Sequence, residues 1–218
     1  MRKDIVTSII AMVFFTLLLG VLYPLVITGV SQVAFPGNAN GQKVYVNGTL
    51  VGSKSIGQSF RVPVLEKNGK PKEEEEEVVT EPDPRYFQSR PSATEGGEYN
   101  AAASAFSNRG PNSVATKEAD EENLKSYLEL EQPYDPGLTA AKVPVDAVNT
   151  SASNLDPDIS QANARIQAHR VASIRGLSLA AVDRLISSYT SERGLFVFGE
   201  PAVNVLELNL ALDRLKAA

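Results

Sequence analysis

Residues Ile5–Val30 read IVTSIIAMVFFTLLLGVLYPLVITGV and contain no charged side chain. At about 1.5 Å per helical residue the stretch extends over roughly 39 Å, which exceeds the ~30 Å of bilayer hydrocarbon. Every face of such a helix is apolar, whereas a core helix of a water-soluble protein carries a polar stripe. We therefore expect a transmembrane helix over residues 5–30, with the rest of the chain tethered to it.

A cleaved signal peptide and a buried globular helix are the other interpretations of this stretch. Signal peptides have an apolar run of roughly 7–15 residues that ends at a small-residue cleavage site. The run here is longer, and the residues that follow it, SQVAF at 31–35, make a poor cleavage site. An uncleaved anchor is the interpretation that we favour, and Pro24 in its second half can bend the helix.

The basic residues near the anchor predict its orientation. Arg2 and Lys3 precede the helix, and the next basic residue is Lys43. Because short cytoplasmic segments carry the excess of Lys and Arg, residues 1–4 are expected in the cytoplasm and residues 31–218 outside.

Bulk composition excludes several classes of function. The chain carries a formal charge of −5, and its first four residues carry +1, which leaves −6 for the outer part. This charge disfavours nucleic acid and anionic lipid as partners. The chain has no cysteine, so disulfides, thiol catalysis and cysteine-bound zinc are excluded. Its one histidine, His169, has no neighbours typical of a metal site or triad, and no metal or tightly bound cofactor is expected.

The outer part reads as one α+β (mixed α/β) extracytoplasmic domain. Residues 43–51 predict two short strands around an Asn-Gly turn. Residues 66–84 contain five consecutive glutamates and predict an extended, solvated or flexible acidic insertion. Helices are expected at 116–131, 161–175 (capped by Ser160 and ended by Gly176), 179–189 (capped by Ser178) and from Asn204 to about 215; strands are expected at 143–148, as an edge strand, and at 195–198.

No phosphate-binding loop, GxSxG, HExxH or SxxK motif occurs. Ser151 and Ser153, near Asp156, could hold a nucleophile, but hydroxyls in such a run usually bond backbone amides in a turn, and we prefer that interpretation. Gln167 and Arg170 share one helix side, where an arginine fork could grip a phosphate or carboxylate. An intramolecular salt bridge of Arg170 is the simpler alternative.

The order of short motifs along nearly the whole chain resembles the KdpC family, the C subunit of the Kdp potassium-transporting P-type ATPase. The matching pieces are LYP at 22–24, SIGQSF at 55–60, YFQSRPSA at 86–93, VPVDAV at 143–148, SASNLDP at 151–157, QAHRV at 167–171 and VNVLELNLAL at 203–212. Two departures are the acidic insertion at 66–84 and the arginine in SNRGP at 107–111, which the family usually lacks there.

The resemblance implies a non-catalytic subunit in a hetero-oligomer of the bacterial or archaeal inner membrane. Its partners would be an ATP-hydrolysing subunit and a channel-like subunit that selects potassium, the transported ion. The family subunit is described as a catalytic chaperone that raises the ATP affinity of the hydrolysing subunit. The resemblance implies nucleotide or partner contacts by Thr150, Ser151, Ser153, Gln167 and Arg170.

Topology conflicts with that ATP role, because a domain outside the membrane cannot meet cytoplasmic ATP. An external cap or clamp that stabilises the complex fits the sequence better. Thr16 and Gly20 form a small-xxx-small pair that lets another membrane helix approach closely. The alternatives are a membrane-anchored hydrolase that uses Ser151 or Ser153, and an anchored binding protein that works alone.

Overall fold

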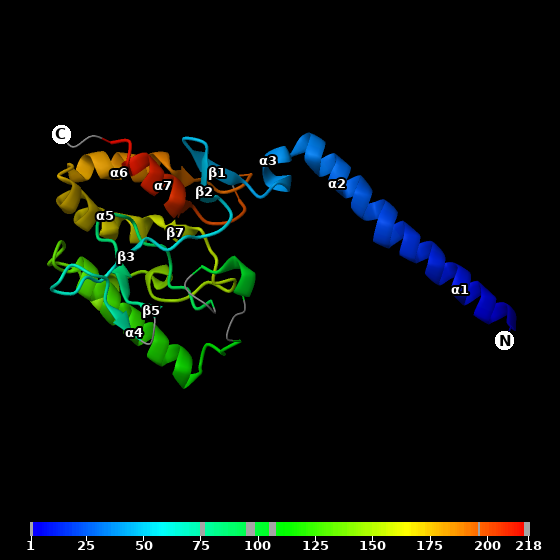
Figure 1. The fold of residues 1–218 in the computed structure, drawn as a ribbon, viewed down its shortest axis with the longest axis horizontal. Helices are drawn as coiled ribbons and strands as arrows, with labels where there is room; N and C mark the ends of the chain where they lie inside the picture. The colour runs from blue at the N-terminus through cyan, green and yellow to red at the C-terminus, as the bar shows by residue number, and fades with distance from the viewer. Residues whose placement is uncertain (1, 75–76, 95–98, 105–107, 196, 216–218) are drawn as a thin grey trace. The chain divides into compact units, whose positions relative to one another are not determined.

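The computed structural model describes residues 2–74, 77–94, 99–104, 108–195 and 197–215. The chain divides into two compact units, Met1–Ser53 and Lys54–Ala218. Figure 1 shows the elements of both units, and each unit is described by itself.

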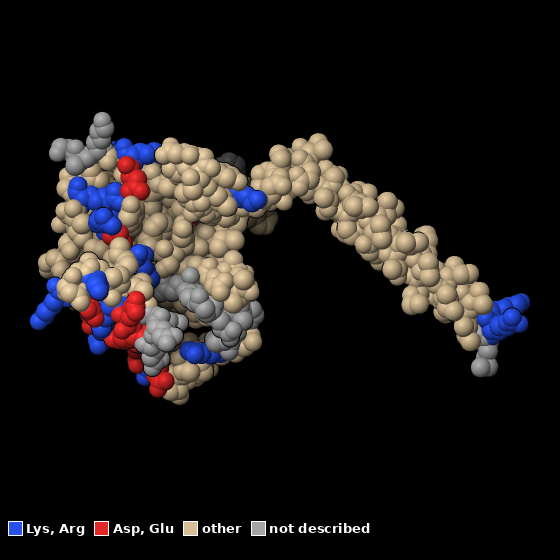
Figure 2. Space-filling view, in the orientation of Figure 1, with Lys and Arg blue, Asp and Glu red and all other residues tan. Residues whose placement is uncertain are grey.

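The first unit is dominated by one long apolar helix. It runs without a break through α1 (Arg2–Leu17), a π-helical turn (Leu18–Leu22) and α2 (Tyr23–Ala34). Its 33 residues have a mean hydropathy of 2.7 over the most apolar window, none of which is buried, so the helix is long and apolar enough to cross a membrane. Figure 2 shows Lys and Arg at its N-terminal end and uncharged residues along the rest of the visible face.

The π-helical turn is a local response to Pro24. The Tyr23 amide donates to the Leu18 carbonyl oxygen, five residues back rather than four. Proline has no amide hydrogen, and its ring crowds the carbonyl one turn earlier. Widening the preceding turn lets the helix continue past the proline.

A short helix and a hairpin complete the first unit. After α3 (Pro36–Ala39), β1 (Lys43–Val46) pairs antiparallel with β2 (Thr49–Ser53). Asn47 and Gly48 turn the chain with φ angles of 50° and 81°. Both angles lie in the left-handed region that a two-residue hairpin turn requires, so the predicted Asn-Gly hairpin is confirmed.

The acidic stretch of the second unit lies in a paired ribbon. β3 (Arg61–Pro63) pairs with β6 (Thr80–Pro82), and β4 (Glu73–Glu74) pairs with β5 (Glu77–Val78). Glu73 and Glu74 are exposed, in keeping with the expected extended, solvated chain, while Glu75 and Glu76 lie outside the described residues. The backbone pairing itself was not foreseen.

Four helices and a small sheet build the rest of the second unit. The helices are α4 (Val114–Glu131), α5 (Gln161–Arg175), α6 (Leu179–Ser188) and α7 (Val205–Leu212), and the sheet has the antiparallel order β7 (Asp158–Ser160), β9 (Ala202–Asn204), β8 (Thr190–Ser191). Figure 1 shows α5 between α4 on one side and α6 and α7 on the other.

Three of these helices, α5, α6 and α7, begin at the residues that the sequence indicates, whereas α4 begins at Val114, two residues before the expected start at 116. Each of three side chains accepts a hydrogen bond from the backbone amide three residues ahead, which is the geometry of an N-cap: Ser160, Ser178 and Asn204. Gly176 ends α5 with a φ of 66°, as expected of a glycine C-cap. The mixed α+β class is therefore confirmed.

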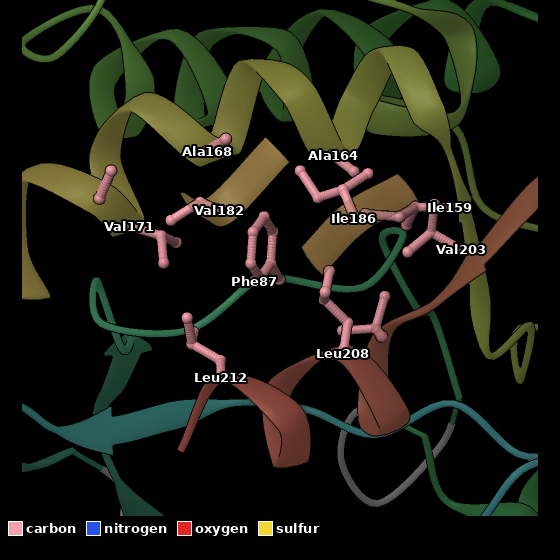
Figure 3. Packing of buried hydrophobic residues seen from close by; sticks show 12 residues of the cluster. Phe87, Ile159, Ala164, Ala168, Val171, Val182, Ile186, Val203, Leu208 and Leu212 are labelled. Carbon is pink, nitrogen blue, oxygen red and sulfur yellow. The ribbon is translucent and has the colours of Figure 1, made fainter. Parts of the chain in front are cut away.

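Phe87 lies at the centre of the hydrophobic core and is fully buried. Figure 3 shows its ring between Ala168 and Val171 of α5 and Leu208 and Leu212 of α7. The other members of the core come from α5, α6, α7 and the small sheet: Ile159, Ala164, Ala172, Val182, Ile186, Val203 and Val205.

The backbone of Phe87 is held by a single residue of α7. Its amide donates to Asn209 Oδ1 at 2.9 Å, and its carbonyl oxygen accepts from Asn209 Nδ2 at 2.9 Å. Asn209 is 1% exposed, so both polar groups of an extended segment are satisfied inside the core.

Two predicted strands are wrong. Residues 143–148 contain the 3₁₀ turn Val145–Ala147 instead of an edge strand. The turn places the Asp146 carboxylate against the start of α5, where it accepts from the Ser160 amide at 2.8 Å and from Asn163 Nδ2 at 3.1 Å. This capping role outweighs the β-propensity of the valines.

Residues 195–198 form a turn rather than a strand. Gly194 and Phe198 make an isolated antiparallel bridge, and Leu195 has a φ of 49°. An apolar run of four residues predicts a strand only if a partner buries it, and here Leu195, Val197 and Phe198 are exposed. Phe196 lies outside the described residues.

Candidate functional site

Three motif segments that are far apart in the sequence are joined by hydrogen bonds into one polar loop cluster: residues 55–60, 86–94 and 149–158. The Gly57 amide donates to the Leu155 carbonyl oxygen at 2.8 Å. Ser89 Oγ donates to the Gln58 carbonyl oxygen, and Ser92 Oγ to that of Asn154, both at 2.9 Å.

Gly57 is required by the closeness of this packing. A Cβ atom at this position would lie 2.5 Å from the Asp156 carbonyl oxygen, closer than such atoms approach. Because the obstacle is backbone, the loop could not make room by rotating a side chain. Glycine therefore lets residues 55–60 lie directly against the 149–158 loop.

Arg90 is the central cation of the cluster. Its Nη1 donates to Asp156 Oδ2 at 2.8 Å, and its Nη2 donates to Asn149 Oδ1 at 2.8 Å and to the Thr150 carbonyl oxygen. Among the described residues, its buried Nε has no hydrogen-bond partner. The arginine fork therefore holds both ends of the 149–156 loop. The sequence reasoning gave Arg90 no role, although its place in the YFQSRPSA motif was a signal.

The hydroxyls at 150–153 lie on the surface of this cluster. Ser151 Oγ and Ser153 Oγ are 3.3 Å apart, and Ser153 Oγ accepts from the Leu155 amide at 3.1 Å. Thr150 and Ser153 are exposed, and Asn154 turns the chain with a φ of 56°. These contacts of the described residues are those of a hydrogen-bonded turn, and none of them sets a base against either serine.

Gln167 and Arg170 lie in a different, buried cluster. Arg170 is 0% exposed and pairs through Nε with Glu131 Oε1 of α4 at 3.0 Å. Its Nη1 donates to the carbonyl oxygens of Pro84 and Tyr86, and its Nη2 to Gln167 Oε1 at 3.1 Å. The intramolecular salt bridge, the simpler of the two interpretations of Arg170, is the arrangement present.

Gln167 completes the attachment of α5 to the extended segment. Its Oε1 accepts from the Gln88 amide at 2.7 Å, and its Nε2 donates to the Gln88 carbonyl oxygen at 3.0 Å. Gln167 therefore binds the Gln88 backbone in the way that Asn209 binds the Phe87 backbone. The segment 84–90 joins the buried cluster to the loop cluster, because Gln88 and Arg90 are two residues apart.

Burial controls the electrostatics of the buried cluster. Burial raises the pKa of the Glu131 carboxyl, and this effect exceeds the lowering by the nearby Arg170 guanidinium. Among the described residues, Glu131 Oε2 has no hydrogen-bond partner. Burial also raises the pKa of Tyr127, whose hydroxyl donates to Asn163 Oδ1. At the edge of the cluster the Arg85 side chain lowers the pKa of Asp83 by hydrogen bonding.

The remaining sequence candidates lie in the apolar helix. A Cβ at Gly20 would meet nothing within 4 Å, and Thr16 is exposed, so the chain leaves room there for another helix. No group of three His, Cys, Asp or Glu side chains able to hold a metal ion occurs in the part of the chain that the structure describes.

Comparisons with known proteins identify the family of the chain. The chain matches the family described as "KdpC: K+-transporting ATPase, c chain" over residues 5–214. It is 43% identical over 209 residues to the potassium-transporting ATPase KdpC subunit of Methylococcus capsulatus, covering 96% of each chain. It is 41% identical to those of Herpetosiphon aurantiacus, over 217 residues (100% and 99%), and Mycobacterium tuberculosis strain H37Rv, over 216 residues (99% and 100%).

The family match spans both units: it covers the apolar helix from residue 5 onward, the acidic ribbon, the loop cluster and the buried cluster. The chain belongs to the KdpC family of potassium-transporting ATPase subunits, and it is therefore a member of the Kdp ATPase complex.

Proposed function

We propose that the chain is a non-catalytic, single-pass subunit that stabilises the assembled potassium-uptake complex from outside the membrane. The observation that carries the proposal is the division of the chain into one exposed apolar helix of 33 residues and a domain whose motif residues bond one another. Arg90, Gln167, Arg170 and Asn209 direct their polar groups to the chain itself, as expected of a rigid binding module.

Orientation follows from the charges at the helix ends. Arg2 and Lys3 stand at the N-terminal end, and the positive-inside rule assigns that end to the cytoplasm. The domain then lies outside, where it meets the external surfaces of the channel-like and ATP-hydrolysing subunits. On this assignment the role of the domain is mechanical: it clamps partner subunits and performs no ATP chemistry.

Labelling of single cysteines tests this topology, because the chain contains no cysteine of its own. Ser126→Cys lies at an exposed position of α4, and Lys3→Cys lies in the first turn of the apolar helix, before its uncharged stretch. In intact cells an impermeant thiol reagent should label the first variant and spare the second. The reverse pattern would move the domain into the cytoplasm and contradict the proposal.

Assembly is tested by omitting the chain. Without it, the other subunits of the complex should co-purify poorly, and potassium-stimulated ATP hydrolysis should fall. Re-expression of the chain should restore both quantities. A fully assembled and fully active complex without the chain would contradict the stabilising role.

A nucleotide contact at the loop cluster is the second candidate, and the exposure of Thr150 and Ser153 favours it. Arg170 and Gln167 would support the loop from the buried cluster rather than touch a ligand, because their polar atoms face Glu131 and the 84–88 backbone. Raised ATP affinity of the hydrolysing subunit, the role described for the family, would require the domain to lie in the cytoplasm.

A photoreactive ATP analogue separates the two candidates. Labelling of the intact complex on residues 149–156, lost in Thr150→Ala/Ser153→Ala, would support nucleotide contact. The clamp proposal predicts that the analogue labels the hydrolysing subunit alone and that the double variant changes neither the labelling nor the apparent affinity for ATP.

A further inference from the structure

The connection between β8 and β9 ends in an exposed apolar turn. Leu195, Val197 and Phe198, which we call the apolar tip, are 81%, 68% and 67% exposed. Large apolar side chains that gather at one exposed turn are typical of a binding site, whereas single exposed residues are ordinary. None of the roles described above uses these three residues.

Hydrogen bonds join the two ends of the tip, on either side of Phe196, which lies outside the described residues. The Gly194 amide donates to the Phe198 carbonyl oxygen at 2.8 Å, and the Phe198 amide donates to the Gly194 carbonyl oxygen at 2.8 Å. On either side of this bridge in the sequence, Arg193 and Glu200 form an ion pair, with 2.6 Å between Arg193 Nη2 and Glu200 Oε2. Because its two ends are already joined in the free chain, the tip loses less conformational entropy on binding than an open loop would, which favours affinity.

Leu195 adds a local conformational cost to the free tip. Its φ of 49° lies in the left-handed region, which a bulky side chain adopts only under constraint. Strain of this kind is concentrated at functional sites, where other interactions compensate for it. In the free domain the Leu195 side chain gains no burial in return, because it is 81% exposed.

The tip is rooted in the core of the domain. Residues 199–201 lead from the tip to β9, and Val203 of β9 is 0% exposed. β9 in turn pairs with β7 and leads into α7, which packs against Phe87. The tip is therefore connected by a short segment to a strand that reaches the core of the second unit.

Charge distinguishes between a membrane and a protein as the occupant of the tip. The whole chain carries −5 and its first 53 residues carry three basic side chains and one acidic, which leaves −7 for residues 54–218. A domain of that charge has no general electrostatic attraction to anionic lipid surfaces. Membership of the complex, in contrast, supplies protein partners.

We propose that the apolar tip docks into an apolar recess on another subunit of the potassium-transporting ATPase complex. The proposal rests on membership of the complex and names a contact that the stabilising role needs. Three exposed apolar side chains close together in the sequence suit a recess with dry walls, and the Arg193–Glu200 pair would lie at its polar rim.

Crosslinking from a single residue identifies the occupant. Val197→Cys, labelled with a photoactivatable thiol reagent in the assembled complex, should crosslink to another ATPase subunit, identified by mass spectrometry. Val145→Cys is the matched control, because Val145 is also 68% exposed and lies in the same unit. Crosslinks from Val197→Cys to lipid alone, or no more protein crosslinks than from Val145→Cys, would overturn the proposal.

Dissociation rates give a second measurement. Leu195→Ala/Val197→Ala/Phe198→Ala should leave the thermal unfolding temperature of the chain unchanged, because the three side chains are exposed. In mild detergent the variant should dissociate from the purified complex at least about tenfold faster than wild type. Val145→Ala should dissociate at the wild-type rate.

The outcomes separate this proposal from the proposed function. A wild-type chain that co-purifies with other subunits, together with a triple variant that dissociates within about twofold of its rate, would contradict the tip alone. A wild-type chain that co-purifies with none of them would contradict the stabilising role and the tip together.

Discussion

Arg170 joins three parts of the second unit through one side chain: α5, Glu131 of α4 and the carbonyl oxygens of Pro84 and Tyr86. Arg170→Met would leave the Glu131 charge buried without a counter-charge and two carbonyl groups without their donor. The expected loss of unfolding free energy is about 3–5 kcal/mol. Thermal unfolding of the full chain in detergent should shift down by at least about 6 °C.

Arg165→Met is the control for this prediction. Arg165 is exposed on the same helix, so its replacement tests the loss of an arginine from α5 without the buried contacts. Its unfolding free energy should stay within about 0.5 kcal/mol of wild type. Equal shifts for the two variants would show that the buried pair contributes no special stability.

The contributions of the Glu131 and Asp83 carboxyls to the unfolding free energy should change in opposite directions as pH rises. Burial raises the pKa of Glu131, so the folded state holds its proton more readily than the unfolded state. Its contribution to the unfolding free energy is therefore fully present at acidic pH and falls as pH rises through the raised pKa. The difference in unfolding free energy between wild type and Glu131→Gln should decrease as pH rises.

Asp83 should behave in the opposite way. Its hydrogen bond to Arg85 lowers its pKa, so its contribution is present above the ordinary pKa of an aspartate and is lost as pH falls through the lowered value. The difference in unfolding free energy between wild type and Asp83→Asn should therefore increase as pH rises. Chemical unfolding across an acidic pH series measures both differences, and a shared sign would contradict the assignment.

Side-chain contacts between residues a few positions apart were predictable from the sequence, and contacts between residues far apart in the chain were not. Ser160 and Asn204 cap helices through amides three residues ahead, so the sequence pattern alone locates them. The Arg170 partner, Glu131, is 39 residues away and lies in the last turn of a helix, where a carboxylate normally faces solvent. Nothing local distinguishes this glutamate from its exposed neighbours in α4.

The apolar helix is the element where a partner contact can be tested without disturbing the domain. A Cβ added at Gly20 meets no atom within 4 Å, so the Gly20→Leu protein in isolation should fold and insert normally. If the Thr16–Gly20 face packs against another membrane helix, the added side chain blocks close approach. Co-purification of the other subunits should then fall, while Gly29→Leu, also in open space, should leave it unchanged. Equal yields for both variants would contradict packing at Gly20.

The acidic ribbon divides into a dispensable part and a structural part. Replacing residues 66–77 with a short Gly/Ser link keeps β3 paired with β6 and should leave assembly and the unfolding temperature near wild type. Replacing residues 66–84 also removes Asp83 and the Pro84 carbonyl that Arg170 contacts. That variant should unfold several degrees lower. A loss of assembly in the shorter replacement would identify the exposed ribbon as an interface.

Elements with a strong repeating pattern were predictable, and short apolar runs were not. The long apolar helix and the capped helices α5 and α6 begin and end close to the predicted residues. The runs at 143–148 and 195–198 have the composition of strands, but one is drawn into a turn by the contacts of Asp146 and the other has no partner that buries it. Composition indicates strand propensity, whereas pairing decides whether a strand forms.

At the scale of the whole molecule, several family motifs of the second unit prove to be one connected framework. Residues 55–60, 84–93, 149–158 and 163–170 contact one another through buried or half-buried hydrogen bonds. The sequence revealed the order of these segments along the chain, and their contacts required the structure. The mechanism of this KdpC subunit therefore depends mainly on which side of the membrane the second unit occupies. Labelling of the variants Ser126→Cys and Lys3→Cys measures that side.

The two hydrogen bonds between Asn209 and the Phe87 backbone have a consequence for biosynthesis. Asn209 is made 122 residues after Phe87. At ribosomal rates of roughly 5–20 residues per second, the two are separated by about 6–24 s of synthesis. Throughout that interval the apolar helix has already been synthesised, whereas the Phe87 backbone lacks Asn209 and the Phe87 ring lacks Leu208 and Leu212 of α7. The hydrophobic core around Phe87 is therefore complete only after α7 has been synthesised.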